Sequence, residues 1–475
     1  MSNLRRIFVS SLYLSFILSA CSSPVPTQVQ SAPTRILPSL QPTLPPATPV
    51  PTMEPVGLGV PMIEYLNEQS NLLVISSVTG KPFDQLPPIP LGTYYKYAFS
   101  PDRKTLAVVS SDQLHLIDLL SWKDRISDVD LHGPINAVLY SPDGSLLALA
   151  GGVPAWDIRI VDTKSGTVKA RAQTDFTIRN LKFTTDGNAL MVYGPHLADT
   201  GIAANVGVSV GVPRAAMFAV SDLSLLWSVG LVGIRDGTFP KKADTANTQD
   251  IYQPGAAWHF EPGIAFAPDH DILYLVHGDK DKLTTVDFAN RKVSTIDIHV
   301  EMSWLDQLLA LTAGVAHAKG MDGTTKQAVI SPDGKFLFVG GNTEAVTQQA
   351  NGENWDITDT ALGLQVIVVK DGTLVKKIDT EAFPFRLSPD GRQVFLTGWK
   401  DGRPWTDVYD ISSKSIIKHL DGMYLIPTRR LDGKPILVST YTSSNVSYTT
   451  LIDPDTWGTV REWKGTDNIG GLIDP

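Results

Sequence analysis

Short apolar segments separated by polar turns repeat along most of the chain. The stretch NAVLYSPDGSLLALAGG, residues 136–152, shows the unit: apolar positions two apart, a Ser-Pro-Asp-Gly corner and a second apolar run. Residues two apart share one face of a β-strand. Pro suits the second position of a turn, and Asp-Gly completes it. Such corners begin at Ser100, Ser141, Thr184, Ala267, Ser331, Ser388 and Arg430.

The spacing of the corners predicts the architecture. Three of the six intervals are close to 42 residues, and the other three are longer by the length of an insertion. A period of about 40 to 45 residues with short alternating strands is typical of propeller blades, each a four-stranded antiparallel sheet. We therefore expect an all-β chain that forms a single β-propeller.

The best-formed unit also carries a family resemblance. GPINAVLYSPDGSLLALAGG, followed by IRIVDTKSG, resembles WD40-like propellers and more closely the bacterial SPDG-repeat propellers of the TolB and YncE type. The resemblance covers about residues 57–475, and its motifs concern turns and packing. The Gly-His pair and the Trp-Asp ending of WD40 units are missing, so that family's Asp-His hydrogen-bond network is not expected here.

The chain ends predict how the ring closes. Residues 61–89 align with the second, third and outer strands of an eighth unit that has no inner strand of its own. The final NIGGLIDP, residues 468–475, could supply that strand and remove the open edges. Eight four-stranded blades are expected, with seven as the alternative, closed by N- and C-terminal strands.

Four long insertions interrupt the repeat, near residues 195–213, 233–263, 299–325 and 342–362. Because antiparallel strands send alternate loops to opposite faces, all four are expected to leave the ring on one face. Long loops on a rigid repeat are usually functional, so we place the binding site there. The third insertion also predicts a helix, with Ser303 as N-cap and an apolar stripe that ends before Gly320.

Polar and aromatic residues in these insertions are the candidate ligand contacts. Aromatic rings beside histidines and carboxylates suit a sugar, a peptide or another small polar ligand. Each of them could equally serve only to hold a long loop in place. The candidates are His196, Asp199, Trp258, His259, Glu261, Glu353, Trp355 and Asp356.

The first residues have the features of an export signal. Arg5 and Arg6 precede an apolar stretch that is too short to span a bilayer. The sequence Leu18-Ser19-Ala20-Cys21 resembles the lipobox of bacterial lipoproteins, which implies cleavage before Cys21 and acylation of its sulfur. Residues 1–20 are then the signal peptide, and the palmitate-type acyl chains on Cys21 anchor the protein to membrane lipid on the extracytoplasmic side.

Residues 21–56 contain the lipidated cysteine and a Pro/Thr/Ser-rich segment with ten prolines after Cys21. Such a segment cannot bury apolar area and is expected to be an extended, disordered tether. It leaves residues 57–475 as the propeller domain. Cys21 is the only cysteine, so once it is acylated no disulfide, zinc-thiolate site or cysteine nucleophile is expected.

Charge and motifs narrow the function classes. The net charge is −9, and −11 without Arg5 and Arg6, which disfavours nucleic acid as a partner. No motif for a metal or another cofactor appears. Residues 207–211 match the G-x-S-x-G pattern of hydrolase nucleophiles, but a strand rather than a helix is expected after them.

Two function hypotheses follow from these observations. The first, which the sequence favours, is a lipid-anchored propeller without enzymatic activity that binds an unknown ligand or protein through its insertions. The alternative is an extracytoplasmic hydrolase or lyase with a His/carboxylate site under the same insertions. If two or three of the candidate side chains lie within hydrogen-bond reach of one another in one pocket, they would indicate a functional site; if they are scattered, binding is favoured over catalysis.

Overall fold

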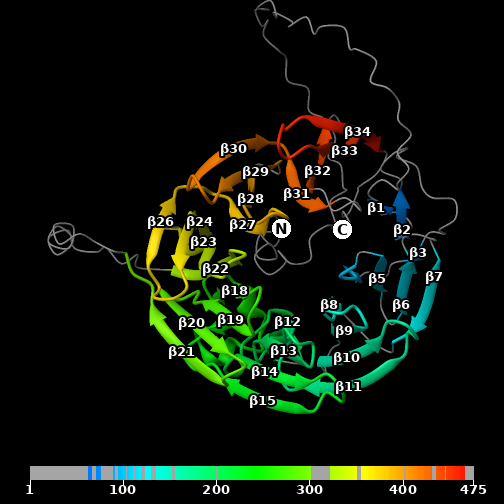
Figure 1. Ribbon diagram of the computed structural model, residues 1–475. Coiled ribbons are helices and arrows are strands. Elements are labelled where there is room, and N and C mark those ends of the chain that lie inside the picture. The colour runs from blue at the N-terminus through cyan, green and yellow to red at the C-terminus, as the bar shows by residue number, and fades with distance from the viewer. Residues whose placement is uncertain are drawn as a thin grey trace, which may run out of the picture.

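The computed structural model describes most of the chain from residue 62 to residue 465. The described ranges are 62–66, 71–75, 89–90, 95–102, 104–110, 113–118, 123–129, 135–151, 156–198, 201–300, 321–349, 355–400, 403–429, 435–443 and 446–465. Their strands form twisted sheets that stand radially in a ring (Figure 1). The protein is therefore a single, all-β propeller, as the repeat predicted.

Six sheets are separate four-stranded antiparallel blades, each built in chain order from the inner to the outer strand. The first two blades are β4 (Tyr95–Phe99), β5 (Thr105–Ser110), β6 (Gln113–Asp118) and β7 (Asp124–Asp128), then β8 (Ile135–Tyr140), β9 (Leu146–Gly151), β10 (Trp156–Asp162) and β11 (Val168–Thr174). The next two are β12 (Asn180–Phe183), β13 (Ala189–Gly194), β14 (Arg214–Ala219) and β15 (Leu225–Gly230), then β18 (Gly263–Phe266), β19 (Ile272–Val276), β20 (Lys282–Asp287) and β21 (Lys292–Asp297). The last two are β27 (Phe383–Leu387), β28 (Gln393–Lys400), β29 (Arg403–Asp410) and β30 (Ser415–Asp421), then β31 (Tyr424–Arg429), β32 (Pro435–Ser443), β33 (Val446–Ile452) and β34 (Thr459–Gly465).

Two further sheets differ from this plan. A seven-stranded sheet contains β16 (Gly237–Pro240), β17 (Ala257–Glu261), β22 (Met321–Ile330), β23 (Phe336–Gln348), β24 (Trp355–Ala361), β25 (Leu364–Val368) and β26 (Leu374–Ile378). A three-stranded sheet contains β1 (Met62–Leu66), β2 (Asn71–Ile75) and β3 (Ile89–Pro90).

The expectation of eight four-stranded blades, or seven, is therefore wrong for the described residues, which form six separate blades of that kind. One unit differs because the hairpin β16–β17 adds to the edge of its inner strand, β22. The unit at the N-terminal end has only three strands. The proposed closing strand, residues 468–475, lies outside the described residues.

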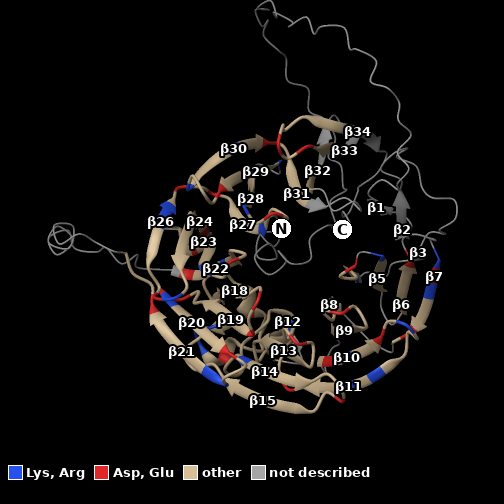
Figure 2. Ribbon diagram, in the orientation of Figure 1, with Lys and Arg blue, Asp and Glu red and all other residues tan. Residues whose placement is uncertain are grey.

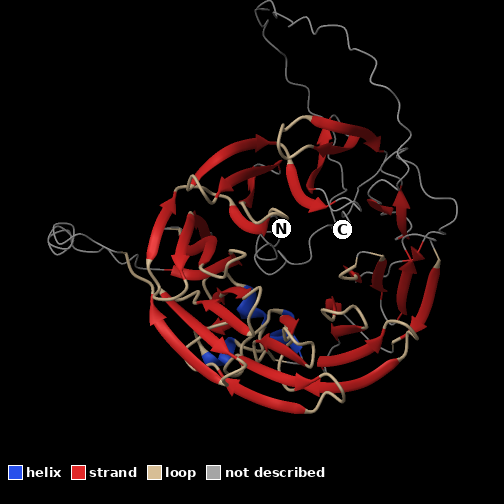
Figure 3. Cartoon of the chain, in the orientation of Figure 1, coloured by secondary structure: helices blue, strands red, loops and turns tan. Residues whose placement is uncertain are grey.

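Helix is scarce in the described part of the chain. It is limited to α1 (Gly201–Asn205) and the 3₁₀ turns η1 (Ala243–Thr245) and η2 (Gln249–Tyr252), which are the blue segments of Figure 3. The helix predicted after Ser303 lies outside the described residues, as do residues 1–20, Cys21 and the tether.

The insertions contain more strand than expected. Residues 342–362 were predicted to be a loop, but β23 continues to Gln348 and β24 pairs with it, because Thr and Val side chains suit a two-stranded ribbon. Likewise, residues 321–325 belong to β22 and residues 257–261 form β17.

Apolar side chains between neighbouring sheets hold the ring together. Val109 of β5 and Leu149 of β9, for example, are both fully buried in one cluster that spans two blades. Leu190 of β13 and Ile158 of β10 share the next cluster, and the pattern continues around the ring. The core is therefore a series of layers between blades, each a face-to-face contact of twisted sheets.

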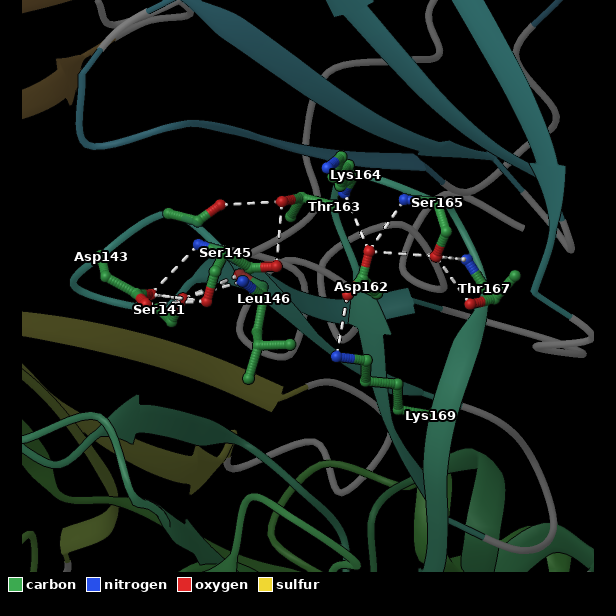
Figure 4. Close-up of polar contacts among 11 residues, drawn as sticks. Ser141, Asp143, Ser145, Leu146, Asp162, Thr163, Lys164, Ser165, Thr167 and Lys169 are labelled. Atoms are coloured by element: carbon green, nitrogen blue, oxygen red, sulfur yellow. Dashed lines mark hydrogen bonds and ion pairs between the residues drawn. The ribbon is translucent and has the colours of Figure 1, made fainter.

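The corner turns repeat one hydrogen-bond arrangement. In the corner at Ser141, the hydroxyl donates to Asp143 Oδ1 over 2.6 Å and accepts the Leu146 amide over 2.9 Å (Figure 4). The equivalent Ser/Thr to Asp hydrogen bonds are 2.6–2.7 Å long in four other corners, at Ser100, Thr184, Ser331 and Ser388. The Ser141 hydroxyl and the Ser145 amide lower the pKa of Asp143, so its carboxylate stays charged.

The corners also form contacts between blades. Gly144 and Gly391 have φ values of +73° and +71°, a region that favours glycine. A Cβ at Gly391 would lie 2.1 Å from the Pro332 ring of the previous corner, and one at Gly144 would lie 3.2 Å from Pro101. The Pro of one corner thus packs on the Gly of the next.

Polar pairs occupy the middle of several third strands. The Asp407 carboxylate accepts from His419 Nδ1 over 2.5 Å, and this hydrogen bond raises the pKa of His419. In another blade, His277 Nε2 lies 2.8 Å from the Thr284 hydroxyl. The first pair joins the third strand to the outer strand and the second joins the end of the second strand to the third, in sequence contexts unlike the WD40 motif.

Replacing Gly391 by Ala should destabilise the protein more than replacing Gly334. Both glycines have φ near +70°, so each substitution incurs the same backbone strain. Only Gly391→Ala also presses on Pro332, whereas a Cβ at Gly334 meets nothing within 4 Å. We expect Gly391→Ala to lower the free energy of unfolding by about 1–3 kcal/mol more than Gly334→Ala, measured by urea denaturation. Equal losses would contradict the contact between corners.

Candidate functional site

Parts of all four insertions join into one structure beside the ring. Within the first, Leu197 bridges to Ser209, and Val208 then pairs in parallel with Thr238 of β16 in the second. The partner strand of β16, β17, pairs in parallel with β22 over residues 259–261 and 323–325. We call these joined segments, residues 195–213 and 233–262 with the extended parts of β22, β23 and β24, the cap.

The cap has a small apolar core of its own. Ala203 of α1 and Ile251 of η2 are buried together with Val208, and Ile202 and Tyr252 pack around them. Figure 3 shows these short helical segments in the same part of the molecule. The first two insertions are therefore packed on each other as well as hydrogen-bonded, which makes the cap an ordered unit.

The hairpin β16–β17 presents two different faces. Thr238 and His259 are opposite each other in the register, and their side chains meet on one face, where Thr238 Oγ1 lies 3.1 Å from His259 Nδ1. The adjacent pair, Phe239 and Trp258, points to the other face because side chains alternate along a strand.

Cations cover the aromatic face. The Arg235 guanidinium lies 5.4 Å from the Phe260 ring centre, 5.6 Å from that of Phe239 and 6.0 Å from that of Trp258. The Lys241 ammonium lies 5.7 Å from Trp258 and also pairs with Asp322 of β22. Trp258 is thus already engaged in cation–π contacts within the chain.

A charged cluster lies on the opposite face, where the cap meets the propeller. Arg179 precedes inner strand β12, Tyr193 is on β13, and Asp236 precedes β16. Asp236 is fully buried; its Oδ1 lies 2.8 Å from Arg179 Nη1, and its Oδ2 accepts the Tyr193 hydroxyl over 2.7 Å. One carboxylate therefore ties the insertion to two strands of the neighbouring blade.

The cluster continues towards solvent through β17. Glu261 Oε1 lies 3.7 Å from Arg179 Nη2 and 3.4 Å from His259 Nε2. The side chains of Arg179, His259 and Glu261 are 24%, 22% and 22% exposed. His259 Nε2 itself is buried, and Glu261 Oε1 is its polar neighbour. Glu261 therefore links the Arg179 guanidinium to the His259 ring at the partly exposed end of the cluster.

Burial and charge set the protonation of these groups. Burial raises the pKa of Asp236, and the Arg179 charge and the Tyr193 hydroxyl offset part of that rise. Burial also acts to raise the pKa of Glu261, but the His259 hydrogen bond and the Arg179 charge outweigh it and lower the pKa. Glu261 is therefore an anion at neutral pH and can accept hydrogen bonds.

The structure brings together two of the eight predicted contact residues, His259 and Glu261. Trp258 lies on the other face of the hairpin. His196 lies in the first insertion, where its carbonyl accepts the Val210 amide, and Asp356 accepts from the Gln349 side chain in the β23–β24 ribbon. Asp199 and Glu353 lie outside the described residues, and for Trp355 only the backbone is described, paired with Gln348.

Sequence reasoning missed Arg179, Tyr193 and Asp236. None of them lies in a recognisable motif, and Arg179 and Tyr193 belong to the regular blade rather than to an insertion. Asp236 lies inside the second insertion, in the short sequence IRDG, which reads as a turn. One feature of the sequence could have indicated the cluster: Tyr193 is a tyrosine in a second strand whose other residues are apolar.

Other classes of site are not evident in the described part of the chain. No group of three or more His, Cys, Asp or Glu side chains there is arranged to hold a metal ion. Ser209 of the G-x-S-x-G segment donates its hydroxyl to the Gly211 carbonyl over 3.1 Å. No described helix is long and apolar enough to cross a membrane.

Comparison with known proteins supports the fold. No protein-family model and no curated protein matches the chain. Among solved structures, dihydro-heme d1 dehydrogenase NirN in complex with DHE is similar with a TM-score of 0.53 and 11% identity, over 89% of this chain and 76% of that one. At such identity the likeness concerns the fold alone.

Two further solved structures match less well. A eukaryotic initiation factor has a TM-score of 0.47 and 12% identity, over 87% of this chain and 97% of that one. The Cps50 (Swd1) β-propeller domain of Myceliophteria thermophila has a TM-score of 0.39 and 11% identity, over 74% of this chain and 94% of that one.

Replacing Asp236 by Asn should loosen the cap. The change removes the charge that balances the Arg179 guanidinium, and breaking such a buried pair costs about 3–5 kcal/mol. We expect a loss of this order in urea denaturation and faster hydrogen exchange of the Thr238 amide, which donates to Gly207. Asp175→Asn is the control, because Asp175 is exposed and 3.6 Å from Arg214. If both variants behaved alike, the cluster would not hold the cap.

Proposed function

We propose that this protein is an extracytoplasmic lipoprotein whose propeller binds a ligand or a protein partner through the cap. The observation that carries the proposal is the meeting of His259, Glu261 and Arg179 at the junction of cap and propeller. Strand β17 of the second insertion provides His259 and Glu261, and the segment just before inner strand β12 provides Arg179. Loops that served only as connections would not need such a cluster.

The chemistry of the cluster favours a small polar ligand or a polar surface of a protein. Glu261 can accept hydrogen bonds and Arg179 can donate them, and both side chains are partly exposed beside the His259 ring. The two carboxylates offset the cationic charge, so the cluster does not favour a strongly charged anion such as a nucleic-acid backbone. A sugar or a peptide presents the mixed donors and acceptors that such a set can bind.

Membrane anchoring rests on the leader and the tether. The lipobox-like Leu18–Cys21 and the proline-rich residues 22–56 support a cell-membrane address, with the propeller held away from lipid on the extracytoplasmic side. Figure 1 places β1–β3 between β31–β34 and β4–β7 in the ring. We propose residues 468–475 as the missing inner strand of that sheet, which would close the ring.

A hydrolase or lyase activity is the second candidate. The 3.4 Å approach of His259 to Glu261 favours it, because a histidine beside a carboxylate can act as a general base. Binding is preferred, because Thr238 and Glu261 account for the position of His259 without any reacting group. Turnover of a bound ligand in the experiment below would favour the enzyme.

Substitutions at His259 and Glu261 should weaken ligand binding at the cap. The mature chain is screened against glycans, peptides and metabolites by thermal shift, and the affinity of any ligand found is measured by calorimetry. We expect His259→Ala and Glu261→Gln to weaken binding by about tenfold or more, because a bound polar group loses its partner. Asp175→Asn, at an exposed carboxylate outside the cap, is the control and should bind normally. Binding that survives both cap substitutions would refute this site.

Replacing Cys21 by Ser should release the protein from the membrane. Without the thiol no acyl chain can be attached, and the described residues contain no helix that spans a bilayer. Metabolic labelling with a palmitate analogue and membrane fractionation test this, with Ser22→Ala as the control. We expect label and membrane association in the wild type and the control, and neither in Cys21→Ser. A wild-type protein without label would end the lipoprotein proposal.

A further inference from the structure

One blade carries a tyrosine at a position where five other units carry an apolar residue. The last residue before the corner is Phe99, Phe183, Phe266, Ile330 or Leu387 in those five units, Arg429 in the blade β31–β34 and Tyr140 in the blade β8–β11. The position faces the core between two blades, and the Tyr140 side chain packs in the cluster that joins β4–β7 to β8–β11. Packing between the blades therefore requires a large apolar side chain at this position, and the hydroxyl of Tyr140 does not contribute to that packing.

The Tyr140 hydroxyl is buried and has no partner among the described residues. The residue is only 6% exposed, and its oxygen accepts and donates no hydrogen bond there. A buried polar group without a hydrogen-bond partner destabilises the folded state. Tyr193 shows the contrast, since its buried hydroxyl donates to Asp236. A hydroxyl that costs stability and adds nothing to packing points to a function.

Tyr140 is one of the residues that line a cavity of about 470 Å³ between the two blades. The cavity is lined by the corners at Ser100 and Ser141, by Arg125 of outer strand β7 and by Thr163 of the β10–β11 turn. A volume of this size lies within the range of ligand sites and holds a small organic molecule. The corner turns belong to the face of the ring opposite the cap, so this cavity is separate from the cluster around His259.

Most hydrogen-bond donors in the cavity wall already donate to groups of the protein itself. The Ser100 hydroxyl donates to Asp102, and the Thr163 hydroxyl lies 2.9 Å from the Gly144 carbonyl. The Arg125 guanidinium donates to the carbonyls of Thr163 and Lys164. Figure 4 shows Asp143 in its own turn, hydrogen-bonded to Ser141 and Ser145, with Thr163 beside it.

Acceptors and one hydroxyl remain available. The carboxylates of Asp102 and Asp143 each accept from their own turn and have further lone pairs. The turn hydrogen bonds lower the pKa of both, so they are anions at neutral pH. Burial raises the pKa of Tyr140, so its hydroxyl keeps its proton and can donate it.

We infer that this cavity binds a polyhydroxylated ligand, a monosaccharide or polyol, between Tyr140, Asp102 and Asp143. The carboxylates need donors and the tyrosine proton needs an acceptor, and a hydroxyl group supplies both from one atom. An ammonium ion would satisfy the carboxylates but offers nothing to accept the tyrosine proton. The Pro101 and Pro142 rings in the wall give the apolar contact that sugar C–H groups require.

Calorimetric titration of the mature chain with D-glucose, D-galactose and sorbitol tests the inference, with putrescine as the cationic comparison. We expect at least one of the three polyols to bind and putrescine not to bind. Tyr140→Phe should weaken polyol binding by about tenfold or more. It should not lower the melting temperature, because phenylalanine occupies the same position in three other blades. Tyr193→Phe should lower the melting temperature and leave polyol binding unchanged.

Three outcomes would overturn the inference. They are binding of no polyol, binding of putrescine instead, and wild-type polyol affinity in Tyr140→Phe. His259→Ala separates this cavity from the cap, since it should leave binding at Tyr140 intact. A polyol whose affinity falls with His259→Ala but not with Tyr140→Phe would support the cap and reject this cavity.

Discussion

The hydrogen bond from a serine or threonine hydroxyl to an aspartate two residues later is the interaction on which the ring depends. It closes the corner between inner and second strands, and the same hydroxyl accepts the amide that begins the second strand. At Gly144, Gly187 and Gly391 the glycine that follows the aspartate adopts positive φ and faces the proline of the previous corner. A local turn thus also sets the spacing between blades. Because its aspartates have lowered pKa values, this contribution is lost only in acid, below the ordinary aspartate pKa.

The cap shows how a regular repeat accommodates added structure. Its hairpin β16–β17 reaches past the blade β18–β21 and adds in parallel to β22, so two non-adjacent parts of the chain share one sheet. The Arg179, Tyr193 and Asp236 cluster fixes the base of this hairpin, while its aromatic face is covered by Arg235 and Lys241. In Figure 2 acidic positions recur at the corner turns and basic positions recur along outer strands such as β7 and β11. The cap cluster is distinct from both patterns because it is buried.

The two proposed sites use buried hydroxyl and carboxylate groups in opposite ways. At the cap, Tyr193 is satisfied by Asp236, and the remaining capacity lies in the partly exposed His259 and Glu261. On the other face, the Tyr140 hydroxyl is unsatisfied within the described residues and the carboxylates beside it are anchored in turns. The cluster at the cap stabilises the junction of cap and propeller and leaves two partly exposed polar side chains. On the other face, a buried hydroxyl is left without a partner, and a ligand can supply one.

The propeller and its corners could be predicted from the amino-acid sequence, because they depend on local rules. Apolar alternation specifies strands, and a Ser-Pro-Asp-Gly corner contains its own hydrogen-bond partners within six residues. The sequence also singled out His259 and Glu261, which the structure places side by side, because both lie in a long insertion. It did not determine the number of separate four-stranded blades, since the parallel pairing of His259–Glu261 with Gly323–Thr325 joins segments more than 60 residues apart. The contact of Arg179 with Asp236, and the lack of a partner for the Tyr140 hydroxyl among the described residues, could be seen only in the folded molecule, because they depend on how neighbouring segments face each other.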